Sequence, residues 1–141
     1  MITVEWRGQP VYVVRRTPEV LEQLANEFRE FVDDPDSEND QKPEYVTGDA
    51  RAIEGHEEYL GMVGLCTHLG CAPQYQPEVG AVALGDGQEW LGGFFCACHG
   101  SMFDLSGRVF KGVPATENLR VPPYRFETDS VIVIGEDQET A

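Results

Sequence analysis

Two short segments hold all 4 cysteines of this chain and two of its 3 histidines. They read Cys66-Thr-His-Leu-Gly-Cys71 and Cys96-Ala-Cys-His-Gly-Ser101. Each segment brings one cysteine and one histidine close together, as Cys66-x-His68 and Cys96-x-x-His99, and each leaves one further cysteine. This pattern constrains the fold more than any other feature, because two remote loops must meet if their ligands share one metal site.

Two kinds of metal site suit two cysteines and two histidines: tetrahedral zinc, and a 2Fe-2S cluster whose outer iron carries histidines. A zinc site of this composition usually pairs like ligands within one turn, whereas here each half mixes cysteine with histidine. Two structural disulfides would need neither the histidines nor Gly64, Gly70 and Gly100. Thioredoxin-like chemistry is disfavoured, because Cys96-Ala-Cys98 is one residue short of Cys-x-x-Cys. The two further cysteines distinguish between these interpretations.

The two segments resemble the ligand boxes of the Rieske iron–sulfur proteins of cytochrome bc complexes. The similarity continues through Phe103-Asp-Leu-Ser-Gly-Arg108 and reaches towards both ends of the chain. It includes Val4-Glu-Trp-Arg-Gly-Gln-Pro-Val11, Arg15-Arg-Thr-Pro18 and Asn118-Leu-Arg-Val-Pro-Pro-Tyr124. The resemblance therefore covers nearly the whole chain, and the paired boxes are highly specific.

This resemblance implies a ligand role for four residues. Cys66 and Cys96 would bind the inner iron of one 2Fe-2S Rieske cluster, and His68 and His99 would bind its outer iron. Because two neutral imidazoles replace two thiolates, such a site is less negative by two charges and takes up an electron more easily than an all-cysteine cluster. The resemblance thus implies an electron-transfer centre of raised potential.

Other matched residues would surround the cluster. Cys71 and Cys98 would form a disulfide that ties the two loops together. Ser101 matches a hydroxyl that donates to a bridging sulfide, and Leu69 matches an apolar residue that packs against partner subunits. The remaining positions in this surrounding set are Gly70, Gly100, Phe103 and Pro114.

Three places depart from the usual pattern of the family. Phe103 stands where most high-potential members have a tyrosine that donates to a cluster cysteine sulfur, which predicts a somewhat lower potential. Ala97 stands where many members have proline between the second-loop cysteines. Gly112-Val-Pro-Ala-Thr116 replaces the more usual Gly-Pro-Ala-Pro, so we expect a longer and less stiff loop on the far side of the cluster.

The resemblance also implies a function, namely one-electron transfer within ubiquinol–cytochrome c reductase, an oxidoreductase complex. The domain would take an electron from ubiquinol at the cytochrome b subunit and pass it to the c-type cytochrome. His99 would accept the quinol hydrogen bond and proton, with His68 as the second exposed imidazole. The isolated domain should not turn over quinol, since another subunit completes the quinol pocket.

Two alternatives carry similar boxes. One is the Rieske small subunit of a molybdenum-containing arsenite oxidase, whose lower potential Phe103 would suit. The other is a Rieske ferredoxin that serves a ring-hydroxylating oxygenase, which fits less well because such ferredoxins usually lack the Cys71–Cys98 pair.

The charge of the chain limits its partners. A net charge of −15 over 141 residues argues against nucleic acid, because phosphate binding needs clustered lysine and arginine. The acidic runs at 33–40 and 136–139 are expected to be solvated faces. Steering towards a basic partner and adaptation to high salt stay open as explanations.

The sequence contains no apolar run near the roughly 18 residues that a bilayer span needs. Family members are anchored in the membrane by one N-terminal helix. We therefore expect this chain to be a head domain without that anchor, located on the periplasmic side of the bacterial inner membrane, where a disulfide can form.

We expect an all-β fold, with a Rieske-type antiparallel β-sandwich base domain that includes one helix. The base domain would comprise 1–58 and 117–141, and a small cluster-binding β subdomain would be inserted at 59–116. Thr17 and Pro18 predict a helix start, with Val20, Leu21, Leu24 and Phe28 on its apolar face. The expected strands are 2–7, 11–14, 59–65, 90–95, 124–127 and 131–134, with a hairpin tip at 85–87. His56 is expected in an exposed loop and not among the ligands.

Overall fold

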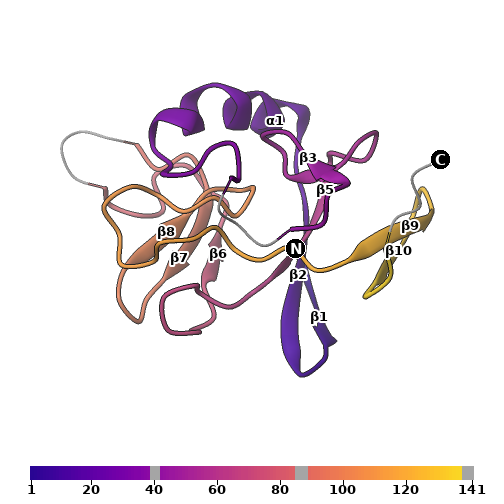
Figure 1. Ribbon diagram of the computed structural model, residues 1–141. Helices are drawn as coiled ribbons and strands as arrows, with labels where there is room; N and C mark the ends of the chain where they lie inside the picture. Colours follow the sequence, from indigo (N-terminus) through magenta and orange to yellow (C-terminus); the bar gives the residue numbers. More distant parts are fainter. Residues whose placement is uncertain (39–41, 85–88, 138–141) are drawn as a thin grey trace.

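The computed structural model describes residues 1–38, 42–84 and 89–137, so the expected hairpin tip at 85–87 lies outside the described residues. The described chain folds into small antiparallel sheets with one short α-helix along one side of the molecule (Figure 1), which confirms the all-β prediction. None of the helices in these described ranges is long and apolar enough to cross a membrane.

Four groups of paired strands build the fold. The largest are two three-stranded sheets, one of β1 (Ile2–Trp6), β2 (Gln9–Arg15) and β5 (Tyr59–Val63), the other of β6 (Gln74–Gln76), β7 (Gly93–Cys96) and β8 (Ser101–Phe103). The two smaller pairs are β3 (Val46–Thr47) with β4 (Ala52–Ile53), and β9 (Tyr124–Thr128) with β10 (Val131–Ile134). In Figure 1 the β9–β10 hairpin lies at the opposite side of the molecule from β6, β7 and β8.

The first hairpin shows how local sequence sets the register of the base sheet. Trp6 pairs with Gln9, so only Arg7 and Gly8 form the turn. Both turn residues have positive φ, 52° and 76°, as a two-residue hairpin turn that follows the twist of its strands requires. Strand β2 then pairs along its other edge with β5, which leads the chain directly into the first ligand box.

The helix begins where the sequence predicts. The Val20 N–H donates to the Thr17 hydroxyl over 3.2 Å, and Pro18 is the first residue of α1 (Pro18–Ala25). The α-helix is shorter than the apolar spacing indicates, because the chain tightens after Asn26 into a 3-10 turn, Glu27–Glu30. Phe28 lies in that turn and is still buried. The apolar spacing therefore identified the buried face correctly but not the helix end.

Three predicted strands are shorter than expected, and the first of them, β1, ends at Trp6 instead of residue 7. Strand β5 ends at Val63, two residues before the predicted end. Strand β7 begins at Gly93 instead of residue 90, because Gly92, directly before it, has a φ of 106° that breaks the extended backbone. Trp90 is nevertheless fully buried, and its indole N–H donates to the Gln76 carbonyl over 2.9 Å.

The two-domain division at residue 59 stays a prediction. Strand β5 falls in the expected inserted subdomain, yet it pairs with β2 of the base sheet over its whole length. The sheet of β6, β7 and β8 has no strand in common with the base sheet. This pairing favours an inserted lobe that begins after β5.

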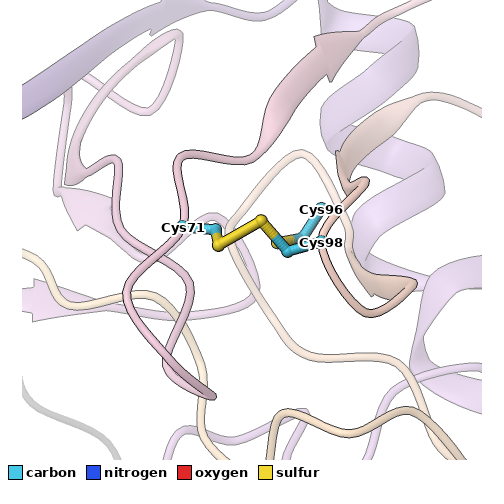
Figure 2. Close-up of side chains that lie close together, drawn as sticks. All are labelled: Cys71, Cys96 and Cys98. Atoms are coloured by element: carbon cyan, nitrogen blue, oxygen red, sulfur yellow. A yellow bond between two sulfur atoms is a disulfide. The ribbon is translucent and has the colours of Figure 1, made fainter.

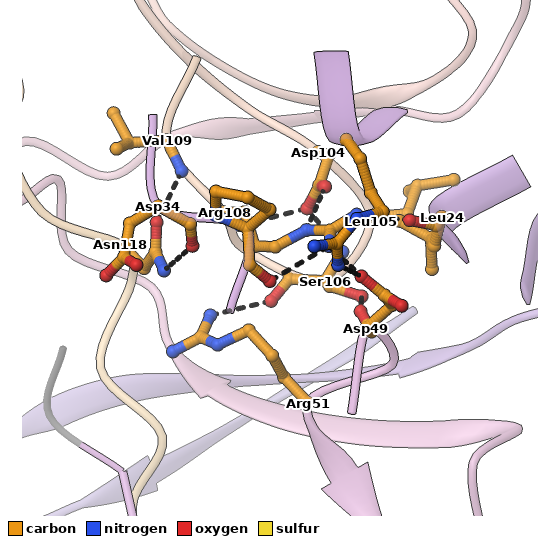
Figure 3. Close-up of polar contacts among 12 residues, drawn as sticks. Leu24, Asp34, Asp49, Arg51, Asp104, Leu105, Ser106, Arg108, Val109 and Asn118 are labelled. Carbon is orange, nitrogen blue, oxygen red and sulfur yellow. Dashed lines mark hydrogen bonds and ion pairs between the residues drawn. The ribbon is translucent and has the colours of Figure 1, made fainter. Parts of the chain in front are cut away.

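A buried polar cluster, here called the arginine hub, joins loops that are remote in sequence. It consists of Arg16, Asp49, Arg51, Asp104, Ser106 and Arg108 (Figure 3 labels all but Arg16). The three guanidinium groups belong to residues that are at most 2% exposed. Buried charges of this kind are tolerated only when they are paired and hydrogen-bonded.

Arg108 contacts both carboxylates of the hub. Its guanidinium donates to the Asp104 and Asp49 carboxylates, each over 2.7 Å, and to the Leu24 carbonyl at the end of α1 over 2.6 Å. The Asp104 carboxylate also accepts the backbone N–H groups of Ser106 and Arg108, which closes the turn after β8. One side chain therefore ties this turn to the helix and to the loop that contains Asp49.

Arg16 and Arg51 fasten the same turn from the base sheet side. Arg51 donates to the carbonyls of Ser106 and Leu119, over 2.7 and 2.8 Å. Arg16 donates to the Ser106 hydroxyl over 2.9 Å and to the Ala50 carbonyl over 2.7 Å. Burial lowers the pKa of Arg16 to about 10, which still leaves it charged at neutral pH. All three arginines therefore act as charged donors to backbone and side-chain oxygens.

We predict that Arg108→Ala lowers the free energy of unfolding by about 3–5 kcal/mol, because it leaves the buried Asp104 carboxylate without its partner. The matched control is Arg125→Ala, which removes an exposed pair with Glu136 and should cost less than about 1 kcal/mol. Urea unfolding followed by circular dichroism measures both. Equal losses in the two variants would contradict the role given to the hub.

Candidate metal centre

The two ligand boxes fold into loops of closely similar form. The Gly70 N–H donates to the Cys66 carbonyl over 2.9 Å, and the Gly100 N–H donates to the Cys96 carbonyl over 2.8 Å. Both glycines have left-handed φ values, +80° and +81°. The second loop is the tip of the β7–β8 hairpin, since Cys96 pairs with Ser101. Each box thus turns its chain back sharply over its own cysteine.

The cysteines separate into a bonded pair and a free pair. Cys71 and Cys98 form a disulfide that joins the two loops, as the resemblance implied. The sulfur atoms of Cys71, Cys96 and Cys98 lie within 4.8 Å of one another (Figure 2). Cys66 and Cys96 are free and buried, and their thiols contact each other.

The two histidines lie at the surface and face each other. His68 and His99 are both exposed. Their ring centroids are 4.9 Å apart and the rings meet edge to face. The site therefore has two levels, with buried thiols from both loops below and exposed imidazoles from both loops above.

The environment of Cys96 opposes a bare thiolate. Burial raises the pKa of the Cys96 thiol, and the adjoining Cys66 thiol raises it further. The backbone N–H groups of Cys98 and His99 act in the opposite direction, because they donate to the Cys96 sulfur. Two thiolates side by side in this setting require a positive partner, and a metal ion is the partner for which thiolates are suited.

The other residues that the family resemblance places around the cluster differ in their burial. The Ser101 hydroxyl is buried and accepts the Ala115 N–H over 3.0 Å, which ties β8 to the loop at 112–116. Phe103 is fully buried in the core, whereas Pro114 is exposed. Leu69 is 68% exposed and directly follows His68 in the first loop.

Comparison with known proteins identifies the family. Residues 31–124 match the Rieske 2Fe-2S domain. This chain belongs to the Rieske family. The chemistry of its donors fits a Rieske 2Fe-2S cluster, because the boxes hold two free buried thiols and two exposed imidazoles whose rings lie 4.9 Å apart.

Several curated relatives are named as subunits of one complex. The ubiquinol-cytochrome c reductase iron-sulfur subunit of Allochromatium vinosum is 49% identical over 141 residues, which is 100% of this chain and 66% of that protein. The subunit of the same name from Rickettsia felis is 42% identical over 135 residues, 95% of this chain and 63% of that protein. The mitochondrial cytochrome b-c1 complex subunit Rieske of Schizosaccharomyces pombe is 37% identical over 134 residues, 94% of this chain and 47% of that protein.

The chain therefore spans less than two thirds of the length of these relatives.

The third histidine of the chain, His56, lies outside the two boxes. His56 is a loop residue, as expected, but it is half-buried because its ring stacks on Phe126 with centroids 3.9 Å apart.

Sequence reasoning missed one contact that holds the first Rieske loop. The Thr67 hydroxyl donates to the Glu117 carbonyl over 2.6 Å, which fastens the loop to the segment that leads out of the 112–116 loop. The position of Thr67 between Cys66 and His68 was the only sequence feature that pointed to a role in the loop. A hydroxyl acceptor 50 residues away could not be inferred from spacing.

We predict that the double substitution Cys71→Ser and Cys98→Ser lowers the free energy of unfolding by about 3–4 kcal/mol, since the disulfide closes a loop with a sequence separation of 27. Urea unfolding measures the change. Wild-type protein treated with a reductant is the control, and it should unfold at the same urea concentration as the variant. A reduced wild type as stable as the oxidised one would show that the disulfide does not stabilise the Rieske loops.

Proposed function

We propose that this domain carries single electrons from ubiquinol to a c-type cytochrome within ubiquinol–cytochrome c reductase. The observation that carries the proposal is the two-level site, which holds buried thiols and exposed imidazoles on loops joined by a disulfide. The identity of 49% with the Allochromatium vinosum iron-sulfur subunit supports the choice of complex. The arsenite oxidase alternative is not favoured, because these relatives are named as subunits of ubiquinol-cytochrome c reductase or of the cytochrome b-c1 complex.

The proposed ligand set follows the two levels of the site. Cys66 and Cys96 hold the inner iron in the buried level, and His68 and His99 hold the outer iron at the surface. When bound, the cluster supplies a centre that gains and loses one electron. The protein's part is to keep the thiolates away from water and to present the imidazoles to a partner.

His99 is proposed as the acceptor of the quinol hydrogen bond and proton, and His68 as the second imidazole open to partners. The support for both is their exposure. Leu69 is an exposed apolar side chain next to His68, and it matches the family position that packs against partner subunits. The proposed partners are the cytochrome b subunit and the c-type cytochrome, and no nucleic acid partner is proposed.

The remaining site residues are proposed to support the cluster from the sides. Ser101 accepts a backbone N–H, so its own hydroxyl proton is left to donate to a bridging sulfide. Gly70 and Gly100 close the two loops in a conformation that other residues rarely adopt. Pro114 belongs to the loop that Ser101 fastens to β8 through the adjacent Ala115.

The location is proposed as the periplasmic side of the bacterial inner membrane. The disulfide supports an oxidising compartment, because thiols are kept reduced in the cytosol. An N-terminal anchor helix outside this chain stays a prediction of the family resemblance.

We predict that the purified domain contains two irons and two acid-labile sulfides per chain, as a 2Fe-2S domain requires. When it is reduced, electron paramagnetic resonance should show the low average g value of a histidine-ligated cluster. Cys66→Ser should lose iron and sulfide, because it removes a proposed ligand. The control is Leu69→Ala, which should keep both. Zinc in place of iron, or a four-cysteine ferredoxin spectrum, would contradict the proposed function.

A second prediction concerns Phe103, which stands at the position of the donor tyrosine. Phe103→Tyr should add a hydrogen bond to a cluster sulfur and raise the midpoint potential by tens of millivolts, because donors to sulfur favour the reduced state. A charge-assisted hydrogen bond contributes about 1.5–3 kcal/mol, but much of it is present in both redox states. A redox titration measures the shift, with Phe95→Tyr as the control on the neighbouring strand. An unchanged potential, with the new hydroxyl shown to lie near the sulfur, would contradict this argument.

A further inference from the structure

Tyr12 connects the base sheet to both Rieske loops. It lies in β2, more than 50 residues before the first box, and it is 7% exposed. Its side chain leaves the sheet and reaches three segments that lie next to the boxes. These are the segment before Cys66, the segment after Cys71 and the segment before Cys96.

The hydroxyl of Tyr12 holds the end of the first loop. It donates to the Pro73 carbonyl over 2.9 Å in a buried setting. Pro73 follows the disulfide residue Cys71 by two positions and is itself buried. A buried carbonyl that loses its donor costs about 1–3 kcal/mol, so this bond fixes where the backbone after Cys71 lies.

The ring of Tyr12 contacts the strands that lead into both boxes. It stacks on Phe94, with centroids 5.8 Å apart and an angle of 18° between the rings, and Phe94 precedes Cys96 by two positions. Its other contact is Gly64, two positions before Cys66, where an added Cβ would overlap the Tyr12 ring. Gly64 does not have a left-handed φ, so the closeness of this ring is the reason for a glycine there.

The protonation state of the Tyr12 hydroxyl agrees with its role as a hydrogen-bond donor. Burial raises the pKa of the Tyr12 hydroxyl, and the nearby Cys96 sulfur raises it further. The hydroxyl therefore keeps its proton at neutral pH and remains a donor to the Pro73 carbonyl.

We propose that Tyr12 is a positioning residue for the cluster, which sets both ligand loops against each other through the Pro73 carbonyl, Gly64 and Phe94. This inference rests on the proposed function, because it concerns the same ligand loops. Sites that bind cofactors need side chains behind the ligands that hold them in place, and rigid strands serve this purpose better than loops. Tyr12 meets this description for both loops at once.

The direct test is Tyr12→Phe in the cluster-containing protein, because it removes only the hydroxyl and keeps the ring on Phe94. Without its donor the Pro73 backbone relaxes. Through the Cys71–Cys98 disulfide, the N–H groups of Cys98 and His99 that donate to the Cys96 sulfur then align less well. Since donors to sulfur favour the reduced state, we expect the equilibrium constant for reduction to fall about threefold, which is about 28 mV at 59 mV per tenfold. The electron paramagnetic resonance lines should broaden as the loops take up more conformations.

The matched control is Tyr75→Phe. Tyr75 also packs on Phe94, with centroids 5.5 Å apart, but among the described residues its hydroxyl has no hydrogen-bond partner. We expect its potential and spectrum to equal those of the wild type. A shift in Tyr75→Phe as large as that in Tyr12→Phe would overturn the inference, and so would an unchanged potential and spectrum in Tyr12→Phe.

A second variant tests the contact with the first loop independently. Gly64→Ala should lower the potential and broaden the spectrum, because its methyl group displaces the Tyr12 ring. Gly61→Ala is the control, because Gly61 also lacks a left-handed φ and an added Cβ there would make only ordinary contacts; its potential should equal that of the wild type. An unchanged potential in Gly64→Ala would overturn the inference. A wild type without a 2Fe-2S signal would instead overturn the proposed function, so the two failures are distinguishable.

Discussion

A guanidinium group with no exposed surface connects the parts of this molecule that the two Rieske loops depend on. Arg108 ends the turn that follows β8, and β8 is the strand that leaves the second loop. Its bonds to Asp104, Asp49 and Leu24 hold the turn, a base loop and α1 together. A buried charge of this kind stabilises the fold only while all its partners are in place, since the loss of one leaves the rest uncompensated. The hub therefore favours a single arrangement of the segments that meet there.

The site was more predictable from sequence than the hub. Cysteine and histidine have few uses in so tight a pattern, so the two boxes indicate a metal or disulfide site, and their resemblance to the Rieske boxes implies the cluster before any fold is known. Arginine has many uses and usually lies at the surface, so nothing in the spacing of Arg16, Arg51 and Arg108 predicts that all three are buried. Their burial follows from carbonyl groups that only the folded chain brings together.

Secondary structure was likewise predictable where it depends on adjacent residues and not where it depends on remote segments. Thr17 and Pro18 predicted the start of the helix because capping depends on adjacent residues. The strands β3, β4, β6 and β8 were not predicted, because two or three residues are too few to show an alternating pattern. The sequence predicts only that Tyr12 belongs to a strand, since the Pro73 carbonyl that accepts its hydrogen bond lies 61 residues further along the chain. Contacts within a few residues can therefore be predicted from the sequence, and contacts between remote segments cannot.

The remote contacts also explain how a surface site can be rigid. The imidazoles and Leu69 must be exposed if partners are to reach them, so the tip itself cannot be held by burial. The loops at this tip must therefore be held by bonds to the buried segments beneath and beside them. The disulfide joins the two loops, Thr67 fastens the first loop to Glu117, and Ser101 fastens the second hairpin to Ala115. Each bond restrains a different segment, so no single one is sufficient. Tyr12 adds to this set, because its side chain extends from one strand of the base sheet and contacts segments next to both loops.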